Sequence, residues 1–85
     1  MHYYVYILKC GDGTLYTGLT NDIDARLAAH REGRGAKYTR GRGPLELVYA
    51  EECTSKREAA KREYHIKKMT REQKKTLIEK RGCQK

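Results

Sequence analysis

The sequence contains no tryptophan and no phenylalanine, so all of its large aromatic side chains are tyrosines. A chain of 85 residues buries only a modest fraction of its surface and forms one small domain with a compact core. Its seven tyrosines must therefore supply the bulky packing together with Leu, Ile and Val. This argues against assigning chemistry to every tyrosine, because a tyrosine on a strand is most often a half-buried packing residue.

Cysteine is also scarce, and Cys10, Cys53 and Cys83 form no close pair and no ligand-like spacing with a histidine. The spacing argues against a structural zinc site and favours thiols without special chemistry. An odd number of cysteines without an N-terminal signal segment indicates a reducing compartment, so we expect a cytoplasmic protein.

Long apolar runs are absent, and no segment is long enough to span a bilayer. Acidic residues are outnumbered: the sequence has 19 Lys and Arg but 11 Asp and Glu, which gives a formal net charge of +8. Polyanions are the natural partners of so basic a small body, and a merely solubilising basic surface is the alternative.

The first strands are predicted at residues 3–9 and 15–19, where β-branched and aromatic residues dominate. The turn residues 10–14 between them indicate a hairpin. Gly18 lies inside the second strand, which indicates either a bulge or the close approach of another backbone or a ligand.

A helix is predicted from the capping residues 20–22 to about Arg31. Its residues Ile23, Arg26, Leu27 and His30 have the spacing of one inward stripe. Arg26 and His30 are four residues apart and share a helical face. A guanidinium at the edge of such a stripe needs a carboxylate, a carbonyl or a phosphate as its partner.

A long basic connection follows at residues 31–43, with four glycines among its cations. We interpret it as a loop that follows phosphates, with an aromatic residue able to stack on a base, and a solvated loop is the alternative. Long loops in compact domains are often functional, which favours nucleic-acid contact. The candidate nucleic-acid-binding residues are Arg34, Lys37, Tyr38, Arg40, Arg42 and, beyond the loop, Lys67.

The remaining elements are a strand at residues 45–51, a helix capped by Ser55 that ends near Met69, and a helix that opens at Thr70 and stops at Gly82. The fold class is therefore α+β, with a small three-stranded antiparallel sheet flanked by helices in the order β-β-α-β-α-α. We expect a single domain over residues 1–85, with its core at about residues 3–78 and a frayed tail at residues 79–85.

Glu63 lies on the apolar stripe of the second predicted helix, although cations occupy much of the remaining surface of that helix. A carboxylate that faces inward normally pairs with a cation. The candidates are Arg26, in a structural ion pair, and a metal ion.

Two tyrosine triplets and one arginine resemble a known family. Tyr4-Val5-Tyr6, then Tyr16-Thr17-Gly18, then Arg26 are similar to the motifs of the GIY-YIG nuclease superfamily, in particular its small stand-alone bacterial members. The resemblance covers about residues 3–78. It includes the segments 36–40, 44–49 and 63–67 in the same order.

The resemblance implies that Glu63 holds one divalent ion, Mg²⁺ or Mn²⁺, and that Arg26 stabilises the transition state. Tyr6 and Tyr16 match the motif tyrosines, and His30 matches a position where relatives carry histidine or tyrosine. Tyr6, Tyr16 and His30 all remain candidates for the general base.

We therefore expect a metal-dependent endonuclease that acts on DNA, more than on RNA, with little sequence preference, in repair or processing. One rival is a non-catalytic nucleic-acid-binding module on the same scaffold. Another is a small basic protein that docks on RNA or a ribosome. The retention of an inward Glu63 speaks against pure binding, because a carboxylate repels phosphate.

Overall fold

The chain forms a three-stranded sheet with helices on both faces. The computed structural model describes residues 2–32 and 44–81. The elements are β1 (Tyr3–Lys9), β2 (Leu15–Thr20), α1 (Ile23–Arg31), β3 (Glu46–Cys53), α2 (Lys56–Lys67) and α3 (Arg71–Arg81). This order confirms the predicted α+β class. Residues 79–81 continue α3, and the rest of the predicted tail lies outside the described residues.

Side-chain caps explain where the helices begin. Asp22 precedes α1, and its carboxylate accepts a hydrogen bond from the Ala25 amide in the first turn of that helix. Ser55 precedes α2, and its hydroxyl oxygen accepts a hydrogen bond from the Glu58 amide. These bonds satisfy backbone donors that have no partner within the first turn of a helix. Thr70 and Gln73 bond each other's amides reciprocally, which confirms the capping box predicted before α3.

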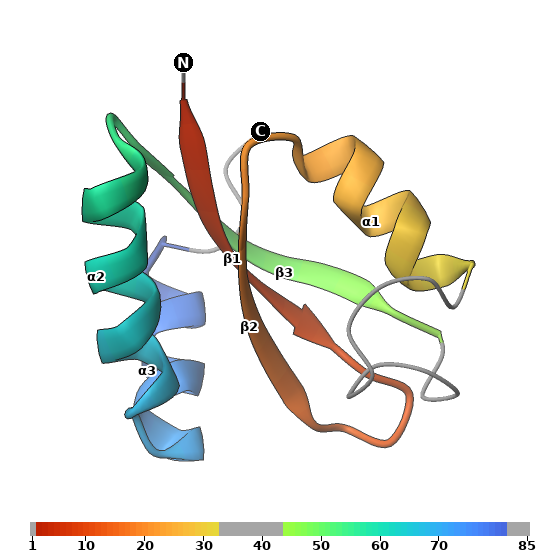
Figure 1. Ribbon diagram of the computed structural model, residues 1–85. Coiled ribbons are helices and arrows are strands. Elements are labelled where there is room, and N and C mark those ends of the chain that lie inside the picture. The colour runs from red at the N-terminus through yellow and green to blue at the C-terminus, as the bar shows by residue number, and fades with distance from the viewer. Residues whose placement is uncertain (1, 33–43, 82–85) are drawn as a thin grey trace.

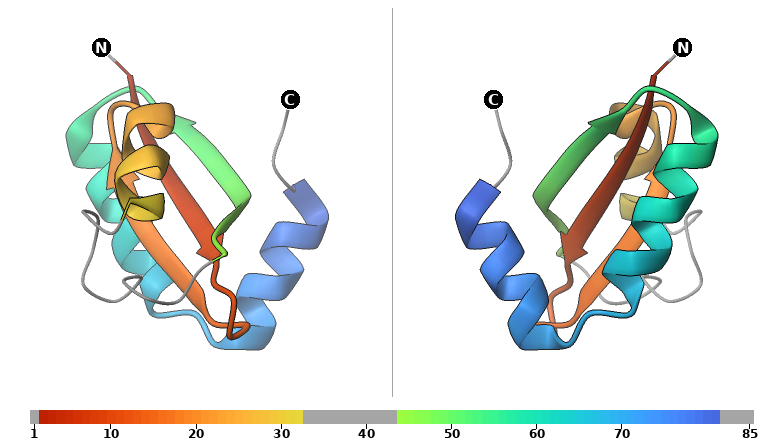
Figure 2. Two further views of the ribbon diagram at one scale, coloured as in Figure 1. Left: turned by 90° about the vertical axis from the view of Figure 1, so that its right-hand side faces the viewer. Right: turned by 90° about the vertical axis from the view of Figure 1, so that its left-hand side faces the viewer.

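The sheet order is β2-β1-β3, and β1 pairs antiparallel with both neighbours. Helix α1 covers one face of the sheet, while α2 and α3 cover the other (Figures 1 and 2). The strand β2 lies at an edge of the sheet, between the layer of α1 and that of α2. This edge is where side chains from both layers can approach one another.

Alternation along β1 creates a separate core on each face. Val5 and Ile7 join a cluster with Ala59 and Ile66 of α2, and Leu77 and Ile78 of α3 pack against it. Tyr6 and Leu8 belong to the second cluster, against which the side chains of α1 pack. The functional tyrosine predicted on β1 is therefore part of the smaller core, under α1.

The pairing of β1 with β3 contains a bulge that the sequence did not predict. Ile7 faces Tyr49 and Leu8 faces Leu47, so Val48 is the extra residue. Because of this bulge, the side chains of Val48 and Tyr49 lie on the same side of the sheet, against the core under α2 and α3. Strand β3 also continues to Cys53, past the predicted end at residue 51, because Cys53 pairs with Tyr3.

Residues 33–43 of the predicted basic loop lie outside the described residues, so Arg34, Lys37, Tyr38, Arg40 and Arg42 receive no structural account. Cys10 and Cys53 are buried free thiols, and Cys83 also lies outside the described part. Among the helices described, none is long and apolar enough to cross a membrane.

Candidate active site

Three rings from three elements meet under α1. The Tyr6 hydroxyl of β1 lies 3.0 Å from Nε2 of His30 on α1, and both side chains are buried. The ring of Tyr16, from β2, packs edge-on against His30 with a centroid separation of 5.4 Å. Its separation from the ring of Tyr6 is 6.4 Å. The structure thus brings together the two phenols and the imidazole that the sequence singled out.

Gly18 makes room for this arrangement. It is the cross-strand partner of Tyr6, and the Tyr6 ring lies directly over it. A Cβ atom at residue 18 would collide with the ring and the hydroxyl of Tyr6. The close approach at Gly18 is made by the side chain of Tyr6, which the sequence did not predict, and the bulge of the sheet lies in β3.

Burial keeps both members of the Tyr6–His30 pair neutral at pH 7. Burial raises the pKa of Tyr6 above its ordinary value of 10.0, and the positive charge of Arg26 opposes this rise. Burial also lowers the pKa of His30 below 6.5, and the charge of Arg26 lowers it further. A neutral phenol beside a neutral imidazole can pass a proton but does not supply a phenolate.

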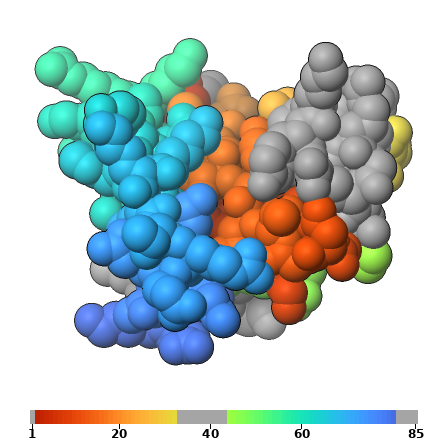
Figure 3. Space-filling view, turned by 90° about the horizontal axis from the view of Figure 1, so that it is seen from below, coloured from red at the N-terminus to blue at the C-terminus, as the bar shows by residue number. Residues whose placement is uncertain are grey.

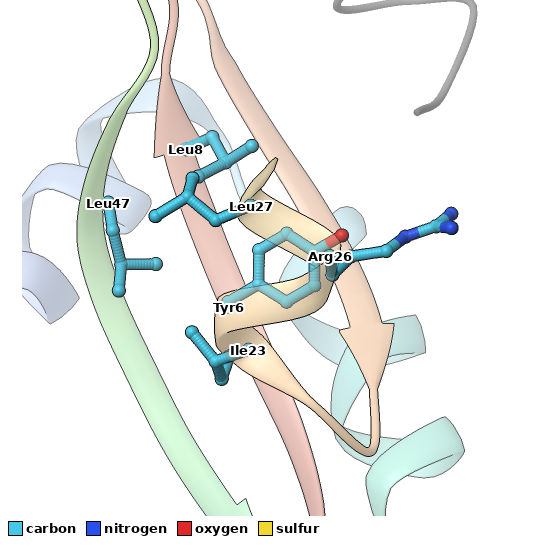
Figure 4. A pocket seen from close by; sticks show the side chains of 6 residues that line it. All are labelled: Tyr6, Leu8, Ile23, Arg26, Leu27 and Leu47. Atoms are coloured by element: carbon cyan, nitrogen blue, oxygen red, sulfur yellow. The ribbon is translucent and has the colours of Figure 1, made fainter. Parts of the chain in front are cut away.

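Arg26 differs from the sequence-based expectation. The residue is exposed, so the expectation that it lies on an inward edge is wrong for its guanidinium. Its stem lines a crevice with Tyr6 and Leu27, while the guanidinium points away from that crevice (Figure 4). The reason is that Ile23, Leu27 and His30 fill the inward stripe of a short helix and leave Arg26 at its margin. Its charge still acts on both Tyr6 and His30.

Glu63 reaches the same region from α2, on the other side of the sheet. Its side chain is 21% exposed, and its negative charge raises the pKa of Tyr6. Its ion-pair partner is Lys67, one turn later on α2, with Nζ 3.3 Å from the carboxylate. The described residues contain no ion pair between Glu63 and Arg26, so the structural pairing considered from the sequence is not formed.

Glu63 suits a divalent ion that keeps most of its water ligands. Within residues 2–32 and 44–81, no three His, Cys, Asp or Glu side chains cluster as a metal cage. Magnesium is commonly held by one or two carboxylates and retains several waters. A partly exposed carboxylate whose partner is an exposed lysine fits that mode of binding.

An open hollow beside Arg26 contains residues that sequence reasoning missed. It is lined by Arg26, by Lys56 at the start of α2, and by Thr20 and Asn21 from the end of β2. The two cations come from opposite layers of the sheet and meet at the β2 edge. Lys56 was visible in the sequence only as one of many surface cations. Its position after the Ser55 cap, at the end of a connection from β3, is what places it here.

Comparison with known proteins decides the family. The model of the GIY-YIG catalytic domain matches residues 2–76. The chain belongs to the GIY-YIG family. Among GIY-YIG relatives, a UPF0213 protein of Clostridium perfringens is 64% identical over 75 residues, which cover 88% of this chain and 81% of the relative. A UPF0213 protein of Staphylococcus epidermidis is 56% identical over 77 residues, covering 91% and 94% of the two chains.

Two solution NMR structures share this GIY-YIG fold. One is of a UPF0213 protein from Bacillus halodurans, with 50% identity, a TM-score of 0.65, and coverage of 96% of this chain and 87% of that one. The other is of a protein from E. faecalis, with 38% identity, a TM-score of 0.66, and coverage of 94% and 85%. The GIY-YIG family of nucleases supports an endonuclease-like function and a nucleic-acid substrate.

Proposed function

We propose that this GIY-YIG protein is a metal-dependent endonuclease that hydrolyses DNA phosphodiesters with little sequence preference, in DNA repair or processing. The observation that carries the proposal is the buried contact of 3.0 Å between the Tyr6 hydroxyl and His30 Nε2. This contact lies where the charges of Arg26 and Glu63 both act on Tyr6. A packing role alone does not require a guanidinium and a carboxylate around one phenol.

The Tyr6–His30 pair moves the proton of the attacking water in this proposal. The Tyr6 oxygen takes a proton from the water while its own proton passes to Nε2 of His30, so no free phenolate forms. His30 must be unprotonated at Nε2 to act as the acceptor, and its lowered pKa keeps it in that form at neutral pH. Tyr16 packs against His30 and orients the imidazole.

Arg26 stabilises the charge that builds on the phosphoryl oxygens. Its exposed guanidinium lies beside the hollow at the β2 edge, and a guanidinium can donate to two phosphoryl oxygens at once. Glu63 would hold the divalent ion, Mg²⁺ or Mn²⁺, which neutralises charge on the leaving oxygen when bound. Lys67, now paired with Glu63, would turn to a phosphate of the bound strand.

The test is cleavage of supercoiled, branched and single-stranded DNA and of RNA, with Mg²⁺ or Mn²⁺, by wild type and by Glu63→Gln. The matched control is Glu46→Gln, which removes an exposed carboxylate from β3. We expect DNA cleavage that survives in the control and is lost in Glu63→Gln. Intact binding without any cleavage would instead favour the non-catalytic binding module.

A metal titration followed by NMR tests the ligand separately. Amide shifts should appear first around Glu63 on α2. Shifts confined to the exposed acids Asp22 and Asp24, at the start of α1, would contradict the proposed metal site.

A further inference from the structure

Helix α3 presents cations beside the apolar Ile78 to the β1–β2 hairpin. Arg71, Lys74, Lys75 and Ile78 have the spacing of one helical face. Two adjoining hollows between α3 and the hairpin share Arg71 and Leu15, and Lys74 lines one while Lys75 lines the other. Seen from the hairpin end, the blue atoms of α3 lie against the red-orange atoms of the hairpin (Figure 3).

The larger hollow has an apolar floor and a basic rim. Its volume is about 260 Å³. Leu15, Val48 and Ile78 form the floor, and Val48 faces it because of the bulge in β3. Lys9 lies at the rim with Arg71 and Lys75, and a single acid, Glu79, also lines the hollow.

These cations lack carboxylate partners. No ion pair within 4.0 Å joins Lys9, Arg71, Lys74 or Lys75 to an acid in the part of the chain that the structure describes. Burial lowers the pKa of Lys74, and the charge of Lys67 lowers it further. Lys74 is thus partly desolvated, which is costly for a cation without a partner, and an anion bound beside it would reduce that cost.

The basic strip is continuous with the candidate active site. Lys67 pairs with Glu63, its charge reaches Lys74, and Lys74 shares a hollow with Arg71. A strand that places one phosphate at Glu63 and Arg26 can therefore continue past Lys67 to the hairpin. Contacts with duplex phosphates require only exposed cations, whereas an apolar floor adds a surface for a sugar or an unstacked base.

We propose that the hollow between α3 and the β1–β2 hairpin binds an unpaired nucleotide of the nucleic-acid strand held at the active site. Arg71 and Lys75 bind its phosphate, and Leu15, Val48 and Ile78 contact its sugar or base. This inference rests on the proposed function for the strand's path, and it makes a substrate with an unpaired segment next to the cleavage site the favoured one.

The experiment is a titration of ¹⁵N-labelled protein with an oligothymidine of eight nucleotides, in EDTA so that cleavage plays no part. We expect amide shifts at Gly13, Leu15, Val48 and Ile78, and no shifts there with a blunt duplex. The variant carrying Arg71→Gln and Lys75→Gln should lose these shifts while keeping those around Tyr6. The control carries Lys61→Gln and Lys80→Gln, exposed cations on the far sides of α2 and α3, and should behave as wild type.

Salt dependence gives a second readout. The plot of log affinity against log salt should become shallower by about 0.7 in the Arg71 and Lys75 variant, because the variant loses the contact with one phosphate and each single-strand phosphate contact contributes about 0.7. The inference is overturned if single strands shift only the Tyr6 region, if both double variants lose affinity equally, or if the duplex shifts the same hollow. Each of these results leaves the cleavage assay unaffected, so failure here is distinguishable from failure of the proposed nuclease activity.

Discussion

Tyr6 and His30 are 24 residues apart in the sequence, yet the phenol oxygen and the imidazole Nε2 lie 3.0 Å apart in a buried contact. The contact joins the central strand to α1 and packs against Tyr16. Burial shifts the pKa of Tyr6 upward and that of His30 downward, so the pair is held neutral. The same contact therefore contributes to folding and is the proton relay of the proposed mechanism.

The stability of the fold should fall as His30 becomes protonated. The pKa of His30 in the folded state lies below its ordinary value of 6.5, so the unfolded chain takes up a proton first. The contribution of neutral His30 is complete above about pH 6.5 and is lost as the pH falls through its lower folded pKa. Urea unfolding between pH 7.5 and 5 should show this loss for wild type and a flatter profile for His30→Gln.

The control for this pH dependence is His65→Gln, which removes an exposed histidine from α2. It should keep the wild-type profile. Parallel profiles for wild type and His30→Gln would contradict a buried, neutral His30.

Gly18→Ala should damage the site although it substitutes no catalytic side chain. The added methyl would overlap the ring and the hydroxyl of Tyr6, and Tyr6 must then leave its contact with His30. Overpacking of this kind costs about 1–3 kcal/mol of unfolding free energy. Chemical denaturation and cleavage should both show a loss, while Gly11→Ala in the exposed turn, whose φ is not positive, should show little. Wild-type stability in Gly18→Ala would mean that the Tyr6 ring does not rest on Gly18.

Thr17→Val should stabilise the protein. Thr17 lies in the sheet with 3% of its surface exposed, and its hydroxyl is buried without a hydrogen-bond partner. Valine keeps the shape and removes the unpaired polar group, which is worth about 1 kcal/mol. Thr14→Val is the contrasting change, because the Thr14 hydroxyl donates to Asp12 and its loss should not stabilise. Equal effects of the two substitutions on the denaturation midpoint would refute the unpaired hydroxyl at Thr17.

Local sequence patterns predicted the helices and strands, because strands, turns and helix caps depend on residues that are neighbours in the sequence. Asp22, Ser55 and Thr70 cap the helices as predicted. The bulge at Val48 and the extension of β3 to Cys53 escaped prediction, because both depend on pairing with β1, across more than forty residues of sequence. Helix α2 likewise ends at Lys67, slightly before the predicted end near Met69.

The sequence predicted candidate residues that the fold brings near one another, but it did not predict their geometry. Helical spacing put Arg26 and His30 on one face, yet only packing decides that His30 is buried and Arg26 exposed. The sequence left Arg26 or a metal ion as the partner of Glu63, and the ion pair that the structure shows is with the local i+4 residue Lys67. Distances between helices on opposite faces of a sheet are set by the whole fold, and no short pattern encodes them.

The most direct test of the account is the rate at which Arg26→Ala nicks supercoiled DNA in Mg²⁺, measured beside its DNA affinity. Arg31→Ala, an exposed arginine at the end of the same helix, is the matched control. Loss of a group that stabilises transition-state charge should slow cleavage about 100- to 1,000-fold, with only a slight loss of affinity and a normal rate in the control. A wild-type rate in Arg26→Ala would contradict the assignment of catalysis to this site.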